Sequence, residues 1–301
     1  MREYQSQLAY VEHFESRLPT TKKMRMKINP LLSVALELKG IESLFSHQAD
    51  SIDLILEGKN VIVTSGPSSG KSLIYYVPTL ESFLADKNST ALYMFPTKAL
   101  AQDQMDSLNS LVASLPKRPV SSMYDGDTPY EDRPNLRGVT NILFTNPDML
   151  HLAILPNHKR WSKYFKNLKY IVLDEAHQYK GVYGSHIALL IRRLRRICSM
   201  YGANPKFILT SATLGNPREH AEALLGVNVE SVEHDGSYRG KRDFALWNPP
   251  IIEPKTGMRR SYLSEGVRLF VKLVEFGSKT LAFARSRQTA ELLHKQFVRC
   301  S

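Results

Sequence analysis

The sequence is poor in cysteine and contains no long apolar run. Its two cysteines, Cys198 and Cys300, are too few for a disulfide framework, which favours a reducing compartment. No stretch of about 18 uninterrupted apolar residues occurs, so no membrane span is expected. The N-terminal segment MREYQSQLAYVEHFESRLP is charged throughout and lacks the apolar core of a secretory signal. These absences predict an intracellular protein, in the nucleus if it is eukaryotic and in the cytoplasm if it is bacterial.

The chain combines a globular composition with an excess of positive charge. Hydrophobic residues make up 43% of the 301 residues and charged residues 23%, so the chain can bury at least one core. The length predicts about two domains. The net charge of +11 is compatible with a polyanionic partner such as nucleic acid. Charge alone is weak support for such a partner, because many basic proteins never bind nucleic acid.

Short β-rich apolar runs alternate with longer helical patterns through much of the chain. The helix predicted over Lys98–Leu115 has its apolar residues on roughly one face, and Asn216 followed by Pro217 is typical of a helix start. Apolar strands separated by helices predict an α/β fold, with helices on both faces of a parallel sheet. Ligands bind such sheets at the carboxyl ends of the strands. The predicted strands are Val61–Ser65, Ala91–Phe95, Asn141–Thr145, Tyr170–Asp174 and Phe207–Ser211.

The pattern changes after Val232. The next residues are rich in proline and glycine and are predicted to form a linker containing at most one strand. A helix (Glu265–Phe276), a strand (Thr280–Ala284) and a helix (Thr289–Phe297) then begin a second α/β unit, which is expected to be incomplete. The predicted parts are an N-terminal extension (1–28), a first domain (29–233), a linker (234–262) and the start of a second domain (263–301).

The first predicted strand leads into the sequence SGPSSGKS and then into a helical pattern. This order is typical of a Walker A loop, in which backbone N–H groups and a helix N-terminus face the phosphates of ATP. Lys71 is expected to reach the β- and γ-phosphates, and the Ser72 hydroxyl to ligate Mg²⁺. The alternative is a Ser/Gly-rich turn before a helix. The predicted nucleotide-binding residues of the loop are Ser65, Gly66, Pro67, Ser68, Ser69, Gly70, Lys71 and Ser72.

A later strand ends in two acids, Asp174 and Glu175, within the tetrapeptide DEAH. In a parallel sheet this position lies beside the phosphate-binding loop. Asp174 is expected to hold Mg²⁺ through water, and Glu175 to orient and deprotonate the attacking water. Taken alone, the pair could also be solvated acids at a strand end. It is accompanied, however, by Ser211–Thr213 at the end of the next strand and by Phe45–Gln48 before the loop.

The motifs GKS, DEAH and SAT, in this order, resemble those of superfamily 2 helicases. Pro96–Gln102 is similar to the first nucleic-acid-contact motif of that superfamily, and Thr145–Pro147 to the next. Within the superfamily, the chain most resembles the RecQ-like DNA-repair branch of the MrfA type, which has fungal and plant relatives. The segments that carry this narrower resemblance are 45–48, 95–104, 124–129, 145–151 and 179–198.

The resemblance implies a RecA-like P-loop NTPase fold and a role for each matching residue. Gln48 is expected to bind the adenine. His177 is expected to act with Lys71 and the two acids and to couple the nucleotide state to Ser211, Ala212 and Thr213. ATP, Mg²⁺ and a single-stranded DNA track are implied, with unwinding in the 3'–5' direction; the oligomeric state is not indicated. The residues expected to contact nucleic acid are Thr97, Lys98, Gly126, Asp127, Thr145, Asn146 and Arg285.

Superfamily 2 motors use arginines of a second RecA-like lobe to complete catalysis, and no motif of that kind occurs in this sequence. We therefore expect an N-terminal fragment of a DNA-repair helicase that binds nucleotide weakly and hydrolyses it poorly. Two other functions stay open. One is an RNA helicase of the DEAH type, because DEAH and SAT do not distinguish DNA from RNA. The other is a non-catalytic module that binds nucleotide and nucleic acid.

Overall fold

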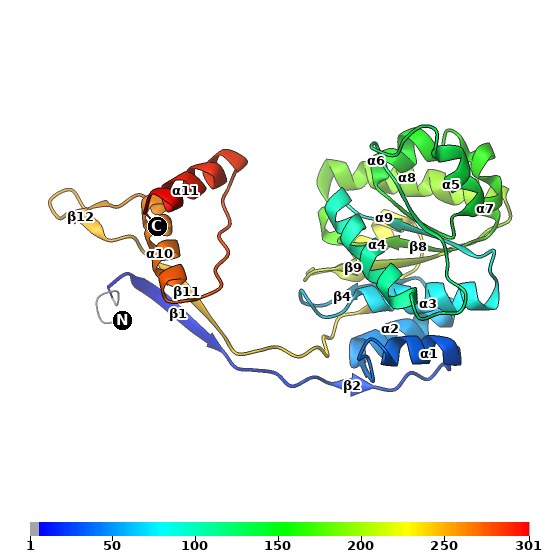
Figure 1. Cartoon of the computed structure of the whole chain (residues 1–301), viewed down its shortest axis with the longest axis horizontal. Coiled ribbons are helices and arrows are strands. Elements are labelled where there is room, and N and C mark those ends of the chain that lie inside the picture. The colour runs from blue at the N-terminus through cyan, green and yellow to red at the C-terminus, as the bar shows by residue number, and fades with distance from the viewer. Residues whose placement is uncertain (1–5, 301) are drawn as a thin grey trace. The chain divides into compact units, whose positions relative to one another are not determined.

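The computed structural model describes residues 6–300 and divides the chain into two units (Figure 1). The larger unit is Leu18–Arg239, and the smaller unit combines the residues up to Arg17 with those from Gly240 onward. Residues 1–5 of the predicted N-terminal extension, and residue 301 of the predicted second domain, lie outside the described residues. Among those described, no helix is both long and apolar enough to span a bilayer.

Seven parallel strands form the sheet of the larger unit, in the spatial order β10-β4-β9-β8-β5-β7-β6. All five strands predicted from the sequence are present, with small shifts at their ends. The two edge strands, β6 and β10, are not predicted by the sequence pattern. The strands are β4 (Val61–Thr64), β5 (Thr90–Met94), β6 (Ser121–Tyr124), β7 (Ile142–Thr145), β8 (Leu168–Leu173), β9 (Lys206–Ser211) and β10 (Glu230–Val232).

Helices cover both faces of this sheet, because side chains alternate along each strand. In β4, for example, Ile62 packs into one hydrophobic core while Val61 and Val63 pack into the other. The predicted α/β fold is therefore confirmed (Figure 1). One face carries α1 (Pro30–Glu37), α2 (Ser46–Leu56), α3 (Ser72–Ala85) and α4 (Lys98–Val112). The other face carries α6 (Pro147–Met149), α7 (Ser162–Lys166), α8 (Gly181–Met200) and α9 (Pro217–Leu225), with α5 (Arg133–Val139) beside them.

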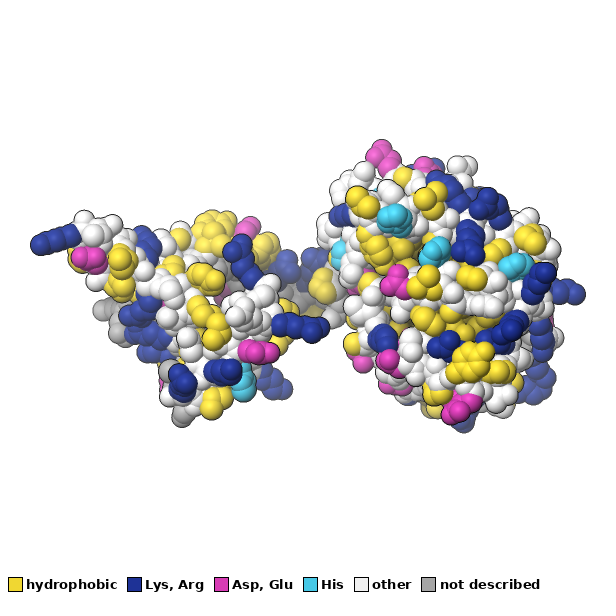
Figure 2. Space-filling model, turned by 90° about the horizontal axis from the view of Figure 1, so that it is seen from above, with side chains coloured by type: hydrophobic (Ala, Val, Ile, Leu, Met, Phe, Trp, Pro, Cys, Tyr) yellow, Lys and Arg dark blue, Asp and Glu magenta, His cyan; other side chains and the backbone are white. Residues whose placement is uncertain are grey.

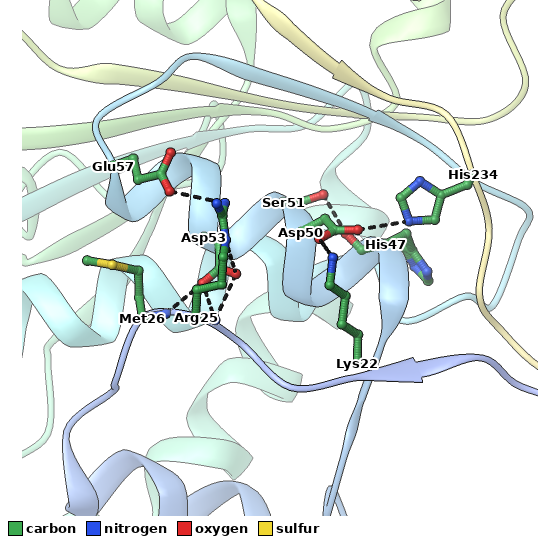
Figure 3. Close-up of polar contacts among 9 residues, drawn as sticks. All are labelled: Lys22, Arg25, Met26, His47, Asp50, Ser51, Asp53, Glu57 and His234. Carbon is green, nitrogen blue, oxygen red and sulfur yellow. Dashed lines mark hydrogen bonds and ion pairs between the residues drawn. The ribbon is translucent and has the colours of Figure 1, made fainter.

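The helix α2 is fixed from outside by a segment near the N-terminus (Figure 3). The fully buried carboxylate of Asp53 accepts hydrogen bonds from the backbone N–H groups of Arg25 and Met26, at 2.9–3.0 Å. Lys22 donates to Asp50 at 2.6 Å. The strand β3 (Leu44–Phe45) lies just before α2 in the chain and pairs antiparallel with β2 (Thr21–Lys22). The last residues of the segment predicted as an extension, 18–28, therefore belong to the larger unit, and their contacts position α2.

Among its described residues, the smaller unit has two antiparallel pairs of strands and two helices. The predicted helices form, with longer bounds. The predicted strand Thr280–Ala284 is wrong: these residues have no regular structure. Within residues 6–300 no strand lies beside them, so their backbone groups have no ladder to join. The elements are β1 (Leu8–Phe14) paired with β11 (Arg242–Trp247), β12 (Ile251–Glu253) paired with β13 (Met258–Arg259), α10 (Tyr262–Glu275) and α11 (Arg287–Cys300).

Candidate nucleotide-binding site

The predicted phosphate-binding loop joins the end of β4 to the start of α3. Two of its residues have left-handed backbone, Ser68 with φ of 56° and Gly70 with φ of 73°. A Cβ at position 70 would lie 2.4 Å from Nε2 of Gln48, so a larger residue there would also displace the end of that side chain. Ser68 has no such freedom, so its conformation is strained. Strain of this kind is typical of loops that are built to hold a ligand.

The Lys71 side chain folds back over the loop. Its Nζ donates to the carbonyl oxygens of Ser65 and Gly66, at 3.1 and 2.9 Å. The loop is tied together at the same end by the hydroxyls of Ser65 and Ser69, which are 2.6 Å apart. The ammonium group therefore lies at the loop itself, where phosphate oxygens could replace the two carbonyls as acceptors.

The Ser72 hydroxyl, a predicted Mg²⁺ ligand, donates to Oε1 of Gln104 at 2.6 Å. The same oxygen accepts from the hydroxyls of Tyr75 and Tyr76, at 3.0 and 2.8 Å. Because a serine hydroxyl has one proton, this bond leaves its oxygen lone pairs for a metal ion. Gln104 lies in the segment that resembles a helicase motif, but its link to Ser72 has no signal in the sequence.

The start of α2 holds the loop through two side chains. Gln48 donates from Nε2 to the carbonyl of Gly70 at 2.8 Å and accepts from Phe45 N–H at 2.9 Å. His47 contacts the carbonyl of Ser69 through Nε2 at 3.1 Å, and its Nδ1 accepts from Gly236 N–H at 3.2 Å. Nδ1 is thus an acceptor, so the neutral ring carries its proton on Nε2 and donates to Ser69. Burial lowers the pKa of His47, which keeps the ring neutral. Sequence reasoning missed His47.

The two predicted acids follow β8 at the carboxyl edge of the sheet. The Asp174 side chain is nearly buried, and its Oδ1 accepts from the Thr210 hydroxyl and, at 3.0 Å, from Glu175 N–H. Burial raises the pKa of Asp174, despite the opposing hydrogen bond from Thr210. Glu175 has left-handed backbone, with φ of 52°. This second strained residue turns the chain sharply at the position of the predicted catalytic base.

His177 connects the acids to the strand end at Ser211. Its Nδ1 lies 3.1 Å from Oε2 of Glu175 and 3.4 Å from both Oγ of Ser211 and N of Ala212. Thr213, the third predicted coupling residue, is exposed. The structure thus brings the DEAH and SAT motifs into contact through one imidazole.

The predicted magnesium ligands supply two oxygens, one from Ser72 and one from Asp174. Both described hydrogen bonds to Asp174 reach Oδ1, which leaves Oδ2 for the ion or its water. Within the described part of the chain, no group of three or more His, Cys, Asp or Glu side chains is placed to hold a metal. This donor set fits an ion that takes most of its ligands from phosphates and water, as Mg²⁺ does.

Some of the residues predicted to contact nucleic acid lie together, and others make only local bonds. Lys98 Nζ pairs with Asp127 and lies 3.6 Å from Asp125, so Lys98 and the loop containing Gly126 are together. The Thr97 side chain accepts from Leu100 N–H at 3.3 Å, as an N-cap of α4.

Two of the remaining predicted contact residues make similar local bonds. Asn146 accepts from Met149 N–H at 2.9 Å and caps α6. Thr145 is 1% exposed: its hydroxyl donates to the Tyr124 carbonyl, and its own carbonyl accepts from Phe95 N–H at 3.1 Å, so the residue is enclosed in the sheet. Arg285 belongs to the smaller unit.

A wide groove lies elsewhere on the larger unit, beside α6 and α8. Its volume is about 980 Å³. Figure 2 shows histidines and hydrophobic side chains among Lys and Arg side chains on the larger unit. None of the residues predicted to bind nucleotide lines the groove. The candidate nucleotide site is therefore assigned from the geometry of the loop and the acids. The groove lining includes Pro147, His151, Tyr183, His186, Leu190 and Arg193.

Comparisons with known proteins agree with this geometry. A family model described as DEAD/DEAH box helicase matches residues 45–220. The uncharacterized ATP-dependent helicase YprA of Bacillus subtilis is 42% identical over 279 residues, which cover 93% of this chain and 37% of YprA. The ATP-dependent helicase hrq1 of Schizosaccharomyces pombe is 44% identical over 269 residues, covering 87% of this chain and 25% of hrq1.

A solved structure of the DUF1998 helicase MrfA bound to DNA and AMPPNP has a TM-score of 0.92 and 40% identity. The match covers 99% of this chain and 42% of the MrfA chain, so the chain spans less than half of each of these relatives. The resemblance to the MrfA type and the RecA-like fold are thereby confirmed. The matched residues include the phosphate-binding loop, both acids and Ser211–Thr213. The chain belongs to the DEAD/DEAH box helicase family.

Proposed function

We propose that this chain is the nucleotide-binding part of an ATP-dependent DNA helicase that acts in DNA repair inside the cell. The observation that carries the proposal is the contact of His177 with both Glu175 and Ser211, beside the phosphate-binding loop. The relatives support the nucleic-acid part, because MrfA is bound to DNA and AMPPNP in its solved structure. The division into extension (1–28), first lobe (29–233), linker (234–262) and second lobe (263–301) is part of the same proposal.

The side chains divide the chemistry of ATP hydrolysis among them. Lys71 exchanges its bonds to the loop carbonyls for the β- and γ-phosphates, and Ser72 and Asp174 hold Mg²⁺. Glu175 orients the attacking water and accepts its proton. His177 contacts Glu175 directly, so a shift of the acid during hydrolysis reaches Ser211 at the end of β9. Mg²⁺ supplies charge stabilisation for the phosphates when it is bound.

The DNA track runs along the ends of β5, β6 and β7 in this proposal. Lys98 must exchange Asp127 for a backbone phosphate, which makes DNA binding sensitive to salt. Thr97 caps α4 after β5, Asn146 caps α6 after β7, and the loop with Gly126 and Asp127 follows β6. Thr145 is the last residue of β7.

Titration of the 301-residue chain with a fluorescent, non-hydrolysable ATP analogue tests the nucleotide site. Lys71→Ala is expected to abolish magnesium-dependent binding, whereas Lys98→Ala leaves it unchanged. A wild-type affinity in Lys71→Ala would overturn the proposed ATP site.

Single-stranded DNA and RNA of equal length then test the track. Preference for DNA, weakened by Lys98→Ala, supports the proposal, and preference for RNA replaces it with an RNA helicase. Glu175→Gln should bind nucleotide normally. If it also hydrolyses ATP as the wild type does, Glu175 is not the base. A non-catalytic binding module is favoured instead if Lys71→Ala leaves every activity unchanged.

A further inference from the structure

The chain leaves the larger unit through residues 234–239, which we name the exit segment. It follows β10 and leads directly to Gly240, where the smaller unit resumes. His234 lies 3.3 Å from Asp50 of α2, through Nε2 and Oδ2 (Figure 3). The backbone of Gly236 accepts from Thr20 N–H at 2.9 Å. The exit segment is therefore anchored to α2 and to the N-terminal segment before it reaches the smaller unit.

Asp235 of the exit segment contacts the phosphate-binding loop directly. Its Oδ2 accepts from the backbone N–H of Gly66 at 3.1 Å and from Arg239 at 2.7 Å, and its Oδ1 accepts from Ser237 N–H at 2.9 Å. The Asp235 side chain is only 8% exposed. Burial opposes its charge, but the bonds from Ser237, Arg239 and Gly66 outweigh burial and hold the pKa of Asp235 well below its usual range. The carboxylate is thus a permanent, charged acceptor for the loop amide.

Glycine at position 66 is explained by this contact. Its φ is not in the left-handed region, so backbone freedom does not require glycine there. A Cβ on residue 66 would lie 2.6 Å from a guanidinium nitrogen of Arg239 and 3.2 Å from Oδ2 of Asp235. The loop backbone and the Asp235–Arg239 pair therefore approach as closely as a residue without a side chain allows.

The exit segment also reaches the second half of the loop. Gly236 N–H donates to Nδ1 of His47, and Nε2 of the same ring contacts the Ser69 carbonyl. A Cβ on Gly236 would lie 2.4 Å from Oγ of Ser46 and 2.6 Å from the Thr20 carbonyl, so this approach also needs glycine. The exit segment thereby fixes two backbone groups of the loop: the N–H of Gly66 through Asp235, and the carbonyl of Ser69 through His47.

We propose that Asp235 and Arg239 are positioning residues that hold the phosphate-binding loop in the conformation that receives Mg·ATP. This inference rests on the proposed nucleotide site. Asp235 holds the Gly66 amide, and Lys71 Nζ donates to the Gly66 carbonyl. The carboxylate therefore fixes a part of the loop that Lys71 itself contacts.

Nucleotide titrations of the 301-residue chain test the proposal with a fluorescent AMP-PNP analogue and Mg²⁺. Asp235→Ala and Asp235→Asn are expected to weaken binding by about tenfold, the effect of losing a charge-assisted bond to the loop. Asp235→Glu recovers part of the affinity. Glu233→Gln is the matched control, because it removes an exposed carboxylate two residues away and should leave the affinity unchanged. An irreversibly misfolded fraction lowers the amplitude of a titration but not its midpoint. A reversible unfolded fraction would have to exceed about nine tenths to imitate a tenfold loss of affinity, which the far-UV circular dichroism of each variant excludes.

A spectroscopic signature separates positioning from general stabilisation. With ¹⁵N-labelled glycine, the Gly66 amide proton is expected downfield, as a donor to a carboxylate, and Asp235→Asn should move it upfield. The glycine resonance that disappears in the Gly66→Ala variant is the resonance of Gly66. This variant should also weaken binding, because its methyl group and the Arg239 guanidinium cannot both fit beside the loop, and adding Arg239→Ala should recover the steric part of that loss.

The outcomes distinguish this inference from the nucleotide site itself. Wild-type affinity in Asp235→Ala, together with lost binding in Lys71→Ala, overturns the inference and leaves the ATP site standing. Wild-type affinity in Lys71→Ala overturns the ATP site. A weakened affinity with an unmoved Gly66 resonance also overturns the inference, because the effect would then not pass through the loop amide.

Discussion

Gln104 offers the sharpest test of how the nucleotide site is built. Its Oε1 accepts from the hydroxyls of Ser72, Tyr75 and Tyr76, and the two tyrosines are 0% and 2% exposed. Gln104→Met keeps the length and apolar volume of the side chain but removes the shared acceptor. The Tyr76 hydroxyl keeps its hydrogen bond to the backbone carbonyl of residue 104, at 2.8 Å, and the Ser72 hydroxyl can donate to water instead. The main cost then falls on the Tyr75 hydroxyl, at about 1–3 kcal/mol for a buried donor that loses its partner.

The expected result is a free energy of unfolding about 2 kcal/mol below that of the wild type, measured by urea denaturation. Gln102→Met is the matched control on the same helix. Gln102 is exposed and donates only across one helix turn in the described contacts, to Asp106, so its change should stay within about 0.5 kcal/mol. Equal stabilities of the two variants would show that Gln104 is not a buried acceptor.

The same variant should also change magnesium dependence. In the wild type, the Ser72 hydroxyl donates a hydrogen bond to the side-chain oxygen of Gln104, which leaves the lone pairs of the Ser72 oxygen directed to the ion. In Gln104→Met the hydroxyl rotates freely, so more Mg²⁺ should be needed for half-maximal nucleotide binding. Titration of Mg²⁺ at fixed nucleotide concentration measures this shift, and an unchanged midpoint would refute the orienting role.

Three further changes have expected outcomes. Ser68→Gly relieves a left-handed backbone and should raise the free energy of unfolding by up to about 1 kcal/mol in urea denaturation; a decrease would contradict the strain. Because burial lowers the pKa of His47 below its ordinary 6.5, the unfolded chain takes up this proton at higher pH than the folded chain does. Stability should fall as pH drops below about 6.5, and His47→Gln should flatten that part of the pH profile. Burial raises the pKa of Asp174, so its charge costs stability at neutral pH; Asp174→Asn should raise Tm by a few degrees in calorimetry while losing magnesium-dependent nucleotide binding.

The central strands and the motif positions are predictable because their signals are local. The strand Val61–Thr64 begins with three fully buried apolar residues, and the strand Leu168–Leu173 ends with three, as parallel strands covered on both faces do. Each strand is followed directly by a distinctive motif, SGPSSGKS or DEAH. The motif supports the prediction of the strand, and the strand supports the assignment of the motif. The edge strand Ser121–Tyr124 lacks the apolar run, because only alternate residues are buried, although it leads into the family-like segment 124–129.

The contacts that complete the site are not predictable, because they join residues far apart in the chain. Asp235 and Gly66 are separated by 169 positions, and nothing near Asp235 resembles a motif. His47 stands beside the predicted Gln48, yet its link from Ser69 to Gly236 depends on packing between α2 and the exit segment. The error at Thr280–Ala284 has the same origin, since an apolar run becomes a strand only when another strand lies beside it.

The strained backbone at Ser68 follows from these long-range contacts. On one side Asp235 holds the amide of Gly66, and on the other His47 holds the carbonyl of Ser69. A left-handed serine persists only where its surroundings over-determine the conformation, and here the surroundings do so from two directions. A loop fixed in this way needs little reorganisation when phosphate arrives, so most of the cost of ordering it is met when the chain folds. The contacts that lie outside the recognisable motif therefore account for the shape that the motif takes.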